Sequence, residues 1–242
     1  TEAGVCEIVD QAARGAEALG VVIIGGHTEV TDAVRIPVIS VAMLGPLVSG
    51  RPVRTGGALA GDLLLQVQPL ALEGTAILAA EHRDKLAETL PGALLEQALG
   101  LTDDPGLSVV EPALLLAGLE GTHAMHDPTE GGLATGIREM MAASGTGCRV
   151  RMKDVMILEA TREICQVLGY APMGLISSGC LLAAIDRAAA GEVQALLQAA
   201  GYATAFIGEV THAPGLYQVE DAQGEPMDLP EFSVDELARV GS

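Results

Sequence analysis

The stretch MHDPTEGGLATG, residues 125–136, places several polar side chains and two glycines at the start of an amphipathic pattern. The apolar residues of this pattern recur at helical spacing and predict one apolar helix face: Leu133, Ile137, Met140 and Met141. Asp127 and Glu130 have the spacing of a capping box, and Pro128 suits a first helical turn. One interpretation of the stretch is therefore an ordinary capped helix.

Gly131 and Gly132 fit this interpretation poorly. A glycine in a first turn costs about 1 kcal/mol relative to alanine, which offsets a cap of about the same value. Paired glycines are typical of a backbone that passes close to another group, such as a phosphate at a helix N-terminus. The neighbouring carboxylate of Asp127 could hold Mg²⁺. The residues alone leave both interpretations open.

The composition limits the class of ligand. The chain has 242 residues, of which 49% are hydrophobic, and a formal net charge of −19. DNA, RNA and anionic membranes attract basic proteins, so we expect none of these partners. An anionic small molecule would need backbone N–H groups and a metal ion for its positive environment.

The cysteines and the hydropathy pattern predict a cytoplasmic protein. Four cysteines are scattered without a CxxC pair, which is neither zinc-site spacing nor a secreted disulfide framework. No apolar run approaches the roughly 20 residues that span a bilayer.

The order of the predicted elements is mixed and indicates an α+β fold. A Pro-, Gly- and Arg-rich stretch at 46–62 predicts a domain boundary. Strands are expected at 21–26, 36–45, 63–67, 122–126, 148–152 and 180–185, and the last two, ATAFIGEV and GLYQVED, are expected to meet in a hairpin-like junction. Helices are expected at 2–19, 73–90, 158–169 and 188–201, with two more between 91 and 121.

Three further stretches are weaker candidates for a site. Gly25, Gly26, His27 and Thr28 follow a predicted strand, where glycines often bring N–H groups to a phosphate, but a double glycine is also a common turn. Gly74 and Thr75 begin a predicted helix and suit either an anion or, more simply, a threonine cap. GLISSGC, 174–180, has no evident His–Asp partner for its serines, which favours a flexible loop over a nucleophile. Cys180 is expected to be buried.

Four motifs in order, GGHTEV, GDLLLQVQPLALEGTAILA, MHDPTEGGLATGIREM and MGLISSGCLLAAI, closely resemble the AIR synthase (PurM-like) superfamily. This group includes HypE, selenophosphate synthetase and thiamine-monophosphate kinase, and the chain looks closest to the HypE-like and AIR synthase-related proteins. The resemblance implies a two-domain architecture. Residues 1–46 would be part of the amino-terminal, ATP-binding and dimerising domain, and 47–242 a complete carboxy-terminal α/β sandwich domain.

The resemblance also implies an ATP- and Mg²⁺-dependent enzyme, a homodimer, in which ATP phosphorylates an amide or carbonyl oxygen or a similar acceptor. Gly25, Gly26, His27 and Thr28 match the family's nucleotide loop. Asp127 matches a metal-binding acidic residue, and Gly131 and Gly132 match glycines that approach phosphates. Gly74 and Thr75 match a substrate-side helix start.

Three departures from the family pattern leave a second hypothesis open. The family's leading segment, with its own metal ligands, is expected to lie outside this chain, which would make it a fragment. No cysteine follows Cys180, although HypE proteins end in a reactive one, and Glu130 stands where HypE commonly has arginine. The alternative function is a non-catalytic scaffold or binding module in cofactor or hydrogenase maturation.

Overall fold

The computed structural model describes residues 2–47, 50–221 and 223–239, and the chain divides into two compact units, Thr1–Pro46 and Leu47–Ser242. The described residues of unit 1 contain one long helix, α1 (Glu2–Ala18), as the helical spacing of its apolar residues predicts. The helix is followed by a turn at Gly20, whose φ of +66° is readily adopted by glycine.

The predicted strands at 21–26 and 36–45 are wrong for the described residues of unit 1, which are irregular and unpaired there. Their apolar side chains face solvent, with Ile24 89% exposed and Val41 78% exposed. A strand is held by hydrogen bonds to a neighbour and by a covered face, so an apolar sequence without either remains irregular.

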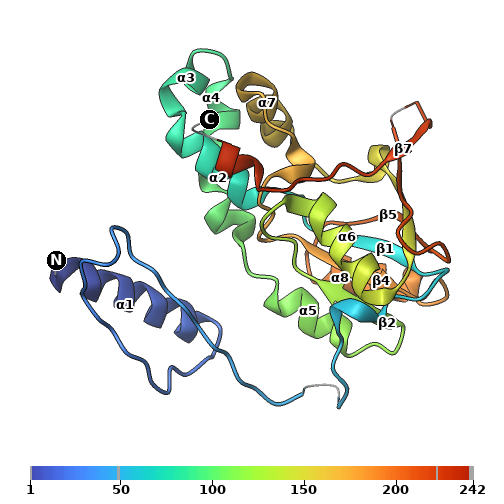
Figure 1. Cartoon of the computed structure of the whole chain (residues 1–242), viewed down its shortest axis with the longest axis horizontal. Helices are drawn as coiled ribbons and strands as arrows, with labels where there is room; N and C mark the ends of the chain where they lie inside the picture. The colour runs from blue at the N-terminus through green and yellow to red at the C-terminus, as the bar shows by residue number, and fades with distance from the viewer. Residues whose placement is uncertain (1, 48–49, 222, 240–242) are drawn as a thin grey trace. The chain divides into compact units, whose positions relative to one another are not determined.

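Unit 2 is built on one mixed sheet, and its seven described strands have the order β2-β4-β1-β5-β3-β6-β7 (Figure 1). The strands are β1 (Leu63–Val67), β2 (Thr122–His126), β3 (Gly147–Arg151), β4 (Leu181–Ile185), β5 (Thr204–Thr211), β6 (Tyr217–Glu220) and β7 (Pro226–Asp228). Strand β4 is antiparallel to both β1 and β2. Consequently β1 and β2 run in the same direction, and their carboxyl ends lie at the edge of the sheet where β4 begins.

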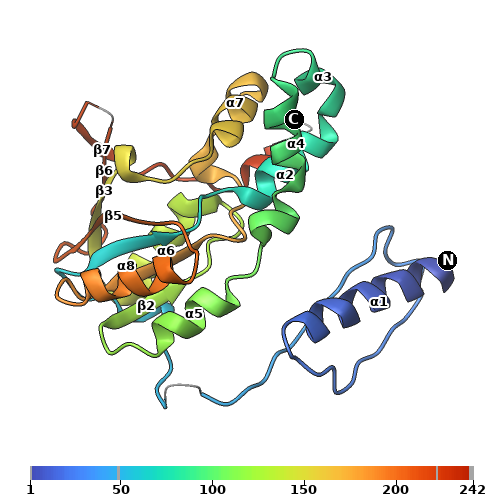
Figure 2. The ribbon, with the colours of Figure 1, turned by 180° about the vertical axis from the view of Figure 1, so that it is seen from behind.

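Helices cover both faces of this sheet, as the two views show (Figures 1 and 2). The described helices of unit 2 are α2 (Leu72–Glu81), α3 (Arg83–Ala87), α4 (Gly92–Gly100), α5 (Val110–Ala117), α6 (Gly132–Ser144), α7 (Glu159–Leu168) and α8 (Ala190–Ala199). Along β4, Leu182 and Ala184 join the larger core with α2, α4, α6 and α7, whereas Leu181 and Ala183 join a second core with α5 and α8. Because neither face meets water, β4 is apolar throughout.

Five short turns complete the described elements: η1 (Thr55–Gly57), η2 (Thr102–Gly106), η3 (Met152–Asp154), η4 (Pro172–Gly174) and η5 (Glu236–Arg239). Two expectations need correction here. The helix predicted at 73–90 is two helices, because His82 leaves the helical region at φ −113° and ψ 25°. The hairpin predicted between the last two strands is absent, because β3 lies between β5 and β6. Alternation predicts a strand but carries no information about its neighbour.

Candidate functional site

Three loops of unit 2 meet at one edge of the sheet. They are the loop between β1 and α2 (68–71), the loop between β2 and α6 (127–131), and the segment that leads into β4 (172–180). Their meeting follows from the strand directions, since β1 and β2 end at the edge where β4 begins. In α/β sheets ligands commonly bind outside the carboxyl ends of the strands, and the corresponding edge is the candidate site here.

Ser177 ties these three loops together from inside the protein. Its side chain is fully buried. Its Oγ accepts a hydrogen bond from the Ala71 N–H at 3.1 Å and donates one to the Leu175 carbonyl at 2.9 Å, and its own N–H donates to the carbonyl of Thr129 at 3.3 Å. The expected flexible loop is therefore wrong for Ser177.

The capping interpretation of Asp127 and Glu130 is wrong in detail. Helix α6 begins at Gly132, and its N-cap is Gly131, which has no side-chain capping bond. The distance along the chain from Asp127 to the helix is too long for a capping box, because the backbone first makes a turn in which both glycines have positive φ, +77° and +66°. Only glycine adopts this region at little cost.

Close packing explains the two glycines as well. A Cβ on Gly132 would lie 2.5 Å from the Met173 carbonyl oxygen and 2.7 Å from that of Leu175. A Cβ on Gly131 would lie 2.4 Å from Oγ1 of Thr135. At Gly132 the helix start therefore lies directly against the loop before β4, and this requires glycine with or without a phosphate.

The N–H groups of both glycines have partners within the protein. The Gly132 N–H donates to the Thr129 carbonyl at 3.0 Å. The Gly131 N–H donates to Oδ2 of Asp235, in the C-terminal segment, at 2.8 Å. A carboxylate thus already interacts with the N-terminus of α6, which has a partial positive charge.

Asp127 directly follows β2, and its side chain is exposed at this edge. Glu130 lies on the same loop, and its pKa is lowered by two hydrogen bonds to its carboxylate. The larger effect comes from the backbone N–H of Glu130 itself, and the smaller one comes from the side chain of Thr129. Within the described ranges no three His, Cys, Asp or Glu side chains gather as a ready-made metal site. A single exposed carboxylate suits Mg²⁺, which keeps several waters and is usually bound by one or two carboxylates together with substrate phosphates.

Gly74 and Thr75 lie inside α2, whose N-cap is Ala71, so the predicted threonine cap is wrong. The Gly74 N–H donates to the Ile176 carbonyl at 3.3 Å, and a Cβ there would meet Leu175 at 2.4 Å. Thr75 is buried, and its hydroxyl lies 2.9 Å from that of Thr161 on α7. Both residues pack α2 against its neighbours, and their substrate-side role stays a prediction.

Gly25, Gly26, His27 and Thr28 belong to unit 1. They line a hollow of about 1020 Å³ between α1 and the extended segment after it. All four residues are exposed. Their assignment to a nucleotide loop stays a prediction.

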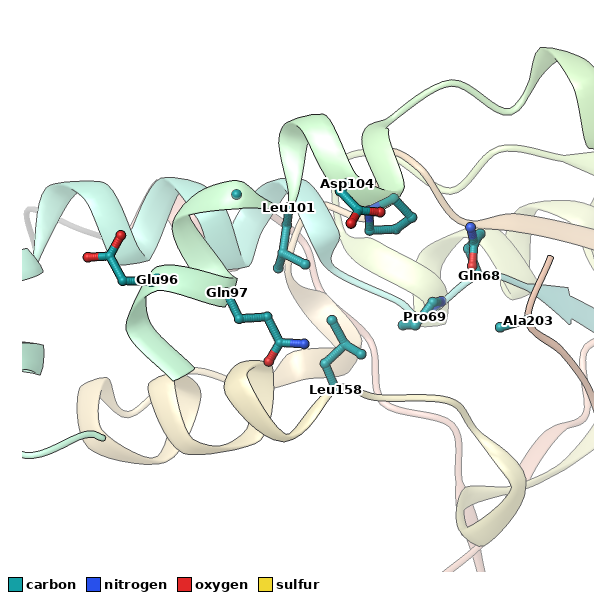
Figure 3. A pocket seen from close by; sticks show the side chains of 10 residues that line it. Gln68, Pro69, Glu96, Gln97, Leu101, Asp104, Leu158 and Ala203 are labelled. Carbon is teal, nitrogen blue, oxygen red and sulfur yellow. The ribbon is translucent and has the colours of Figure 1, made fainter. Parts of the chain in front are cut away.

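A smaller cavity of about 390 Å³ is lined in part by Gln68 and Pro69 of the β1–α2 loop (Figure 3). Leu101 and Leu158 form its apolar part, and the side chains of Gln68, Gln97 and Asp104 surround it. The described residues that line it include two carboxylates and no lysine, arginine or histidine. This charge disfavours phosphate, so the cavity is a poor candidate for a nucleotide.

The thiols differ in accessibility, and a labelling experiment can measure this. Cys6 is exposed, whereas Cys148, Cys165 and Cys180 are buried, and burial raises the pKa of each of these three to about 12. Since the thiolate is the reactive form, we expect a disulfide reagent such as DTNB to modify one thiol per native chain within minutes and four after denaturation. Rapid modification of a second thiol in the native protein would contradict the structure.

The family of the chain follows from comparison with known proteins. The family model described as "AIR synthase related protein, C-terminal domain" matches residues 60–219, which include all three loops of the candidate site. The chain belongs to this family. Unit 2 carries the AIR synthase-related match, and the mixed α+β sheet agrees with the predicted PurM-like fold class.

Sequence and structure comparisons show that, within the AIR synthase-related family, the chain is HypE-like. It is 30% identical to "Carbamoyl dehydratase HypE" of Escherichia coli over 232 residues, 92% of this chain and 64% of the relative. The crystal structure of E. coli HypE superposes with a TM-score of 0.63 at 28% identity, covering 77% of this chain and 55% of that one. A "Selenide, water dikinase" of Dechloromonas aromatica is 32% identical, covering 66% of this chain and 43% of the relative. The fold is also that of a HypE solved in complex with ATP, at 23% identity, a TM-score of 0.57, and coverage of 75% of this chain and 53% of that one.

This chain therefore spans between two fifths and two thirds of the length of these AIR synthase-related proteins. Among its described residues, no helix combines the length and hydropathy needed to cross a membrane.

Sequence reasoning missed two residues of this AIR synthase-related site. Ser177 was not predicted to connect the loops, and Asp235 was not predicted to interact with the start of α6. Neither has a local signal, because each interacts with a residue about 100 positions away.

Proposed function

We propose that the protein is an ATP- and Mg²⁺-dependent, HypE-like enzyme that activates an amide or carbonyl oxygen, or a similar acceptor, by phosphoryl transfer. The observation that carries the proposal is the edge of unit 2 at which Asp127 is exposed next to the glycine-led N-terminus of α6. The membership in the AIR synthase-related family and the similarity to a dikinase support it.

The charge of the chain explains why a metal belongs to the proposal. With 32 acidic and 13 basic residues, the protein repels a polyphosphate at long range. Mg²⁺ would neutralise part of the phosphate charge, and the carboxylate of Asp127 would hold it from the protein side. The N-terminus of α6 would favour the remaining negative charge through its dipole.

The other residues have positioning roles in this proposal. Gly25, Gly26, His27 and Thr28 would form the nucleotide loop of unit 1, and Gly74 and Thr75 would keep α2 in place on the acceptor side. Ser177 would hold the loops after β1 and β2 at constant separation, so that phosphate and acceptor approach in one geometry. Two copies of the chain would pair through unit 1.

Isothermal titration calorimetry with Mg·ATP tests the proposal on the whole chain. We expect Asp127→Asn to weaken binding at least tenfold, because the carboxylate is the protein's ligand to the metal. Asp103→Asn is the matched control, since Asp103 is also exposed but lies in η2 and not in the loop between β2 and α6, and it should bind like the wild type.

Two results would count against the proposal in different ways. Equal affinity of Asp127→Asn and Asp103→Asn would remove the metal role from Asp127. No binding of Mg·ATP by any of the three proteins would favour the alternative function, a scaffold or binding module that keeps the fold.

A further inference from the structure

The C-terminal segment 229–239, here called the strap, runs from β7 past the start of α6 toward α2 (Figure 1). It is held at its beginning by the Arg138 guanidinium on α6. That group donates hydrogen bonds to the carbonyls of Leu229 and Pro230, the second at 3.2 Å, and lies over the ring of Tyr217 at 5.1 Å. The strap therefore starts from a fixed position beside the candidate site.

The middle of the strap packs on the loop before β4. A Cβ on Gly174 would lie 2.3–2.6 Å from ring atoms of Phe232, so the ring rests directly on the backbone of Gly174. The same loop also contacts Gly132, through the backbone of residues 173–175. The strap, the loop and the start of α6 thus pack together.

Two carboxylates hold the end of the strap to backbone N–H groups. Oδ2 of Asp235 accepts from the Gly131 N–H and Oδ1 accepts from the Leu237 N–H, both at 2.8 Å. Glu236 is 2% exposed, and its Oε2 accepts from the Ala171 N–H at 2.8 Å while Arg239 pairs with both of its oxygens at 2.7 Å. Glu236 therefore fixes the end of the strap to the rest of unit 2. Asp235 accepts one hydrogen bond from the start of α6 and one from the strap itself.

The oxygen of Asp235 lies where an anion would contact the Gly131 N–H. One N–H group cannot donate fully to a carboxylate and to a phosphate at the same time, and the two negative charges repel each other at contact distance. A phosphate at this position therefore has to displace Asp235.

We propose that Asp235 is a built-in competitor for phosphate, and that the strap lowers the affinity of the α6 N-terminus for phosphate until Asp235 is displaced. This inference rests on the proposed function insofar as the phosphate in the cell would be that of ATP or of a phosphorylated acceptor. The competition itself needs no nucleotide, and inorganic pyrophosphate can test it.

The experiment is a titration of the whole chain with inorganic pyrophosphate, without Mg²⁺, followed by the NMR amide signals of Gly131 and Leu237. In the wild type we expect both amides to respond together, because Asp235 bridges them. In Asp235→Ala we expect the Gly131 signal to saturate at a pyrophosphate concentration at least fivefold lower. Asp235→Asn keeps the shape of the side chain and should show a shift in the same direction.

Glu231→Gln is the matched control, because Glu231 is an exposed carboxylate of the same strap and its loss changes the net charge equally. It should bind pyrophosphate within twofold of the wild type. Equal changes in pyrophosphate affinity in the Asp235 and Glu231 variants would show that only long-range charge is involved, and would overturn the inference. Unchanged affinity in both Asp235 variants, or no pyrophosphate binding by either of them, would also overturn it.

This outcome is separate from that of the proposed function. Tighter pyrophosphate binding by Asp235→Ala supports the competitor role even if Mg·ATP fails to bind in calorimetry. Conversely, normal Mg·ATP binding with unchanged pyrophosphate affinity leaves the proposed function in place and removes the competitor role.

Discussion

Gly132→Ala is expected to destabilise the protein by about 3 kcal/mol, because two penalties add at this residue. Its φ of +66° is unfavourable for any residue with a Cβ. The added carbon would also lie 2.5 Å and 2.7 Å from two backbone carbonyl oxygens, which cannot move aside as a side-chain end can. The free energy of unfolding from urea titration, followed by circular dichroism, measures the effect.

Gly145→Ala is the matched control for this prediction. Gly145 ends the same helix with nearly the same φ, +65°, but nothing lies within 4 Å of a Cβ there. It should cost about 1 to 2 kcal/mol from the backbone alone. Equal losses in the two variants would show that the loop before β4 does not press on Gly132 as the structure describes.

Ser177→Ala is expected to cost about 2 kcal/mol, because it leaves the buried N–H of Ala71 without its acceptor. Ala71 itself has a φ of +58°, which is unusual for a residue other than glycine, and the bond to Ser177 helps to hold it there. We therefore expect the amide of Ala71 to exchange with solvent faster in this variant than in the wild type. Urea unfolding and hydrogen exchange measure the two effects.

Ser178→Ala separates the role of Ser177 from a general sensitivity of this loop. Ser178 is the adjacent serine and is only half-buried. Its replacement should change the free energy of unfolding by no more than about 0.5 kcal/mol. Similar losses in both variants would contradict the role assigned to Ser177, which is to tie the three loops together.

Much of unit 2 could be predicted from local patterns. Strands at 63–67 and 122–126 coincide with β1 and β2, and the helices predicted at 158–169 and 188–201 are α7 and α8 with slightly shifted ends. The spacing of apolar residues predicts these elements correctly because other helices or strands cover one or both faces of each element. The apolar residues on those faces are therefore buried.

The same reasoning failed where a pattern lacked its partner or had several physical explanations. The apolar stretches 21–26 and 36–45 are unpaired among the described residues, so their composition alone does not make them strands. At 125–136, the sequence offered one cause for Gly131 and Gly132, the close approach of the backbone to a group such as a phosphate, because a helix cap does not explain them. The structure adds another cause, positive φ at both glycines and, at Gly132, contact with the backbone of 173–175.

The amino-acid sequence by itself determines the α+β class, the family and the position of the Asp127–Gly132 stretch between a strand and a helix. These properties depend on residues near one another along the chain and on an ordered set of motifs. Only the folded chain brings Ser177 to Ala71 and Asp235 to Gly131, across 106 and 104 positions. Such contacts depend on the order of strands in the sheet and on the path of the C-terminal strap, and no local pattern of side chains encodes either.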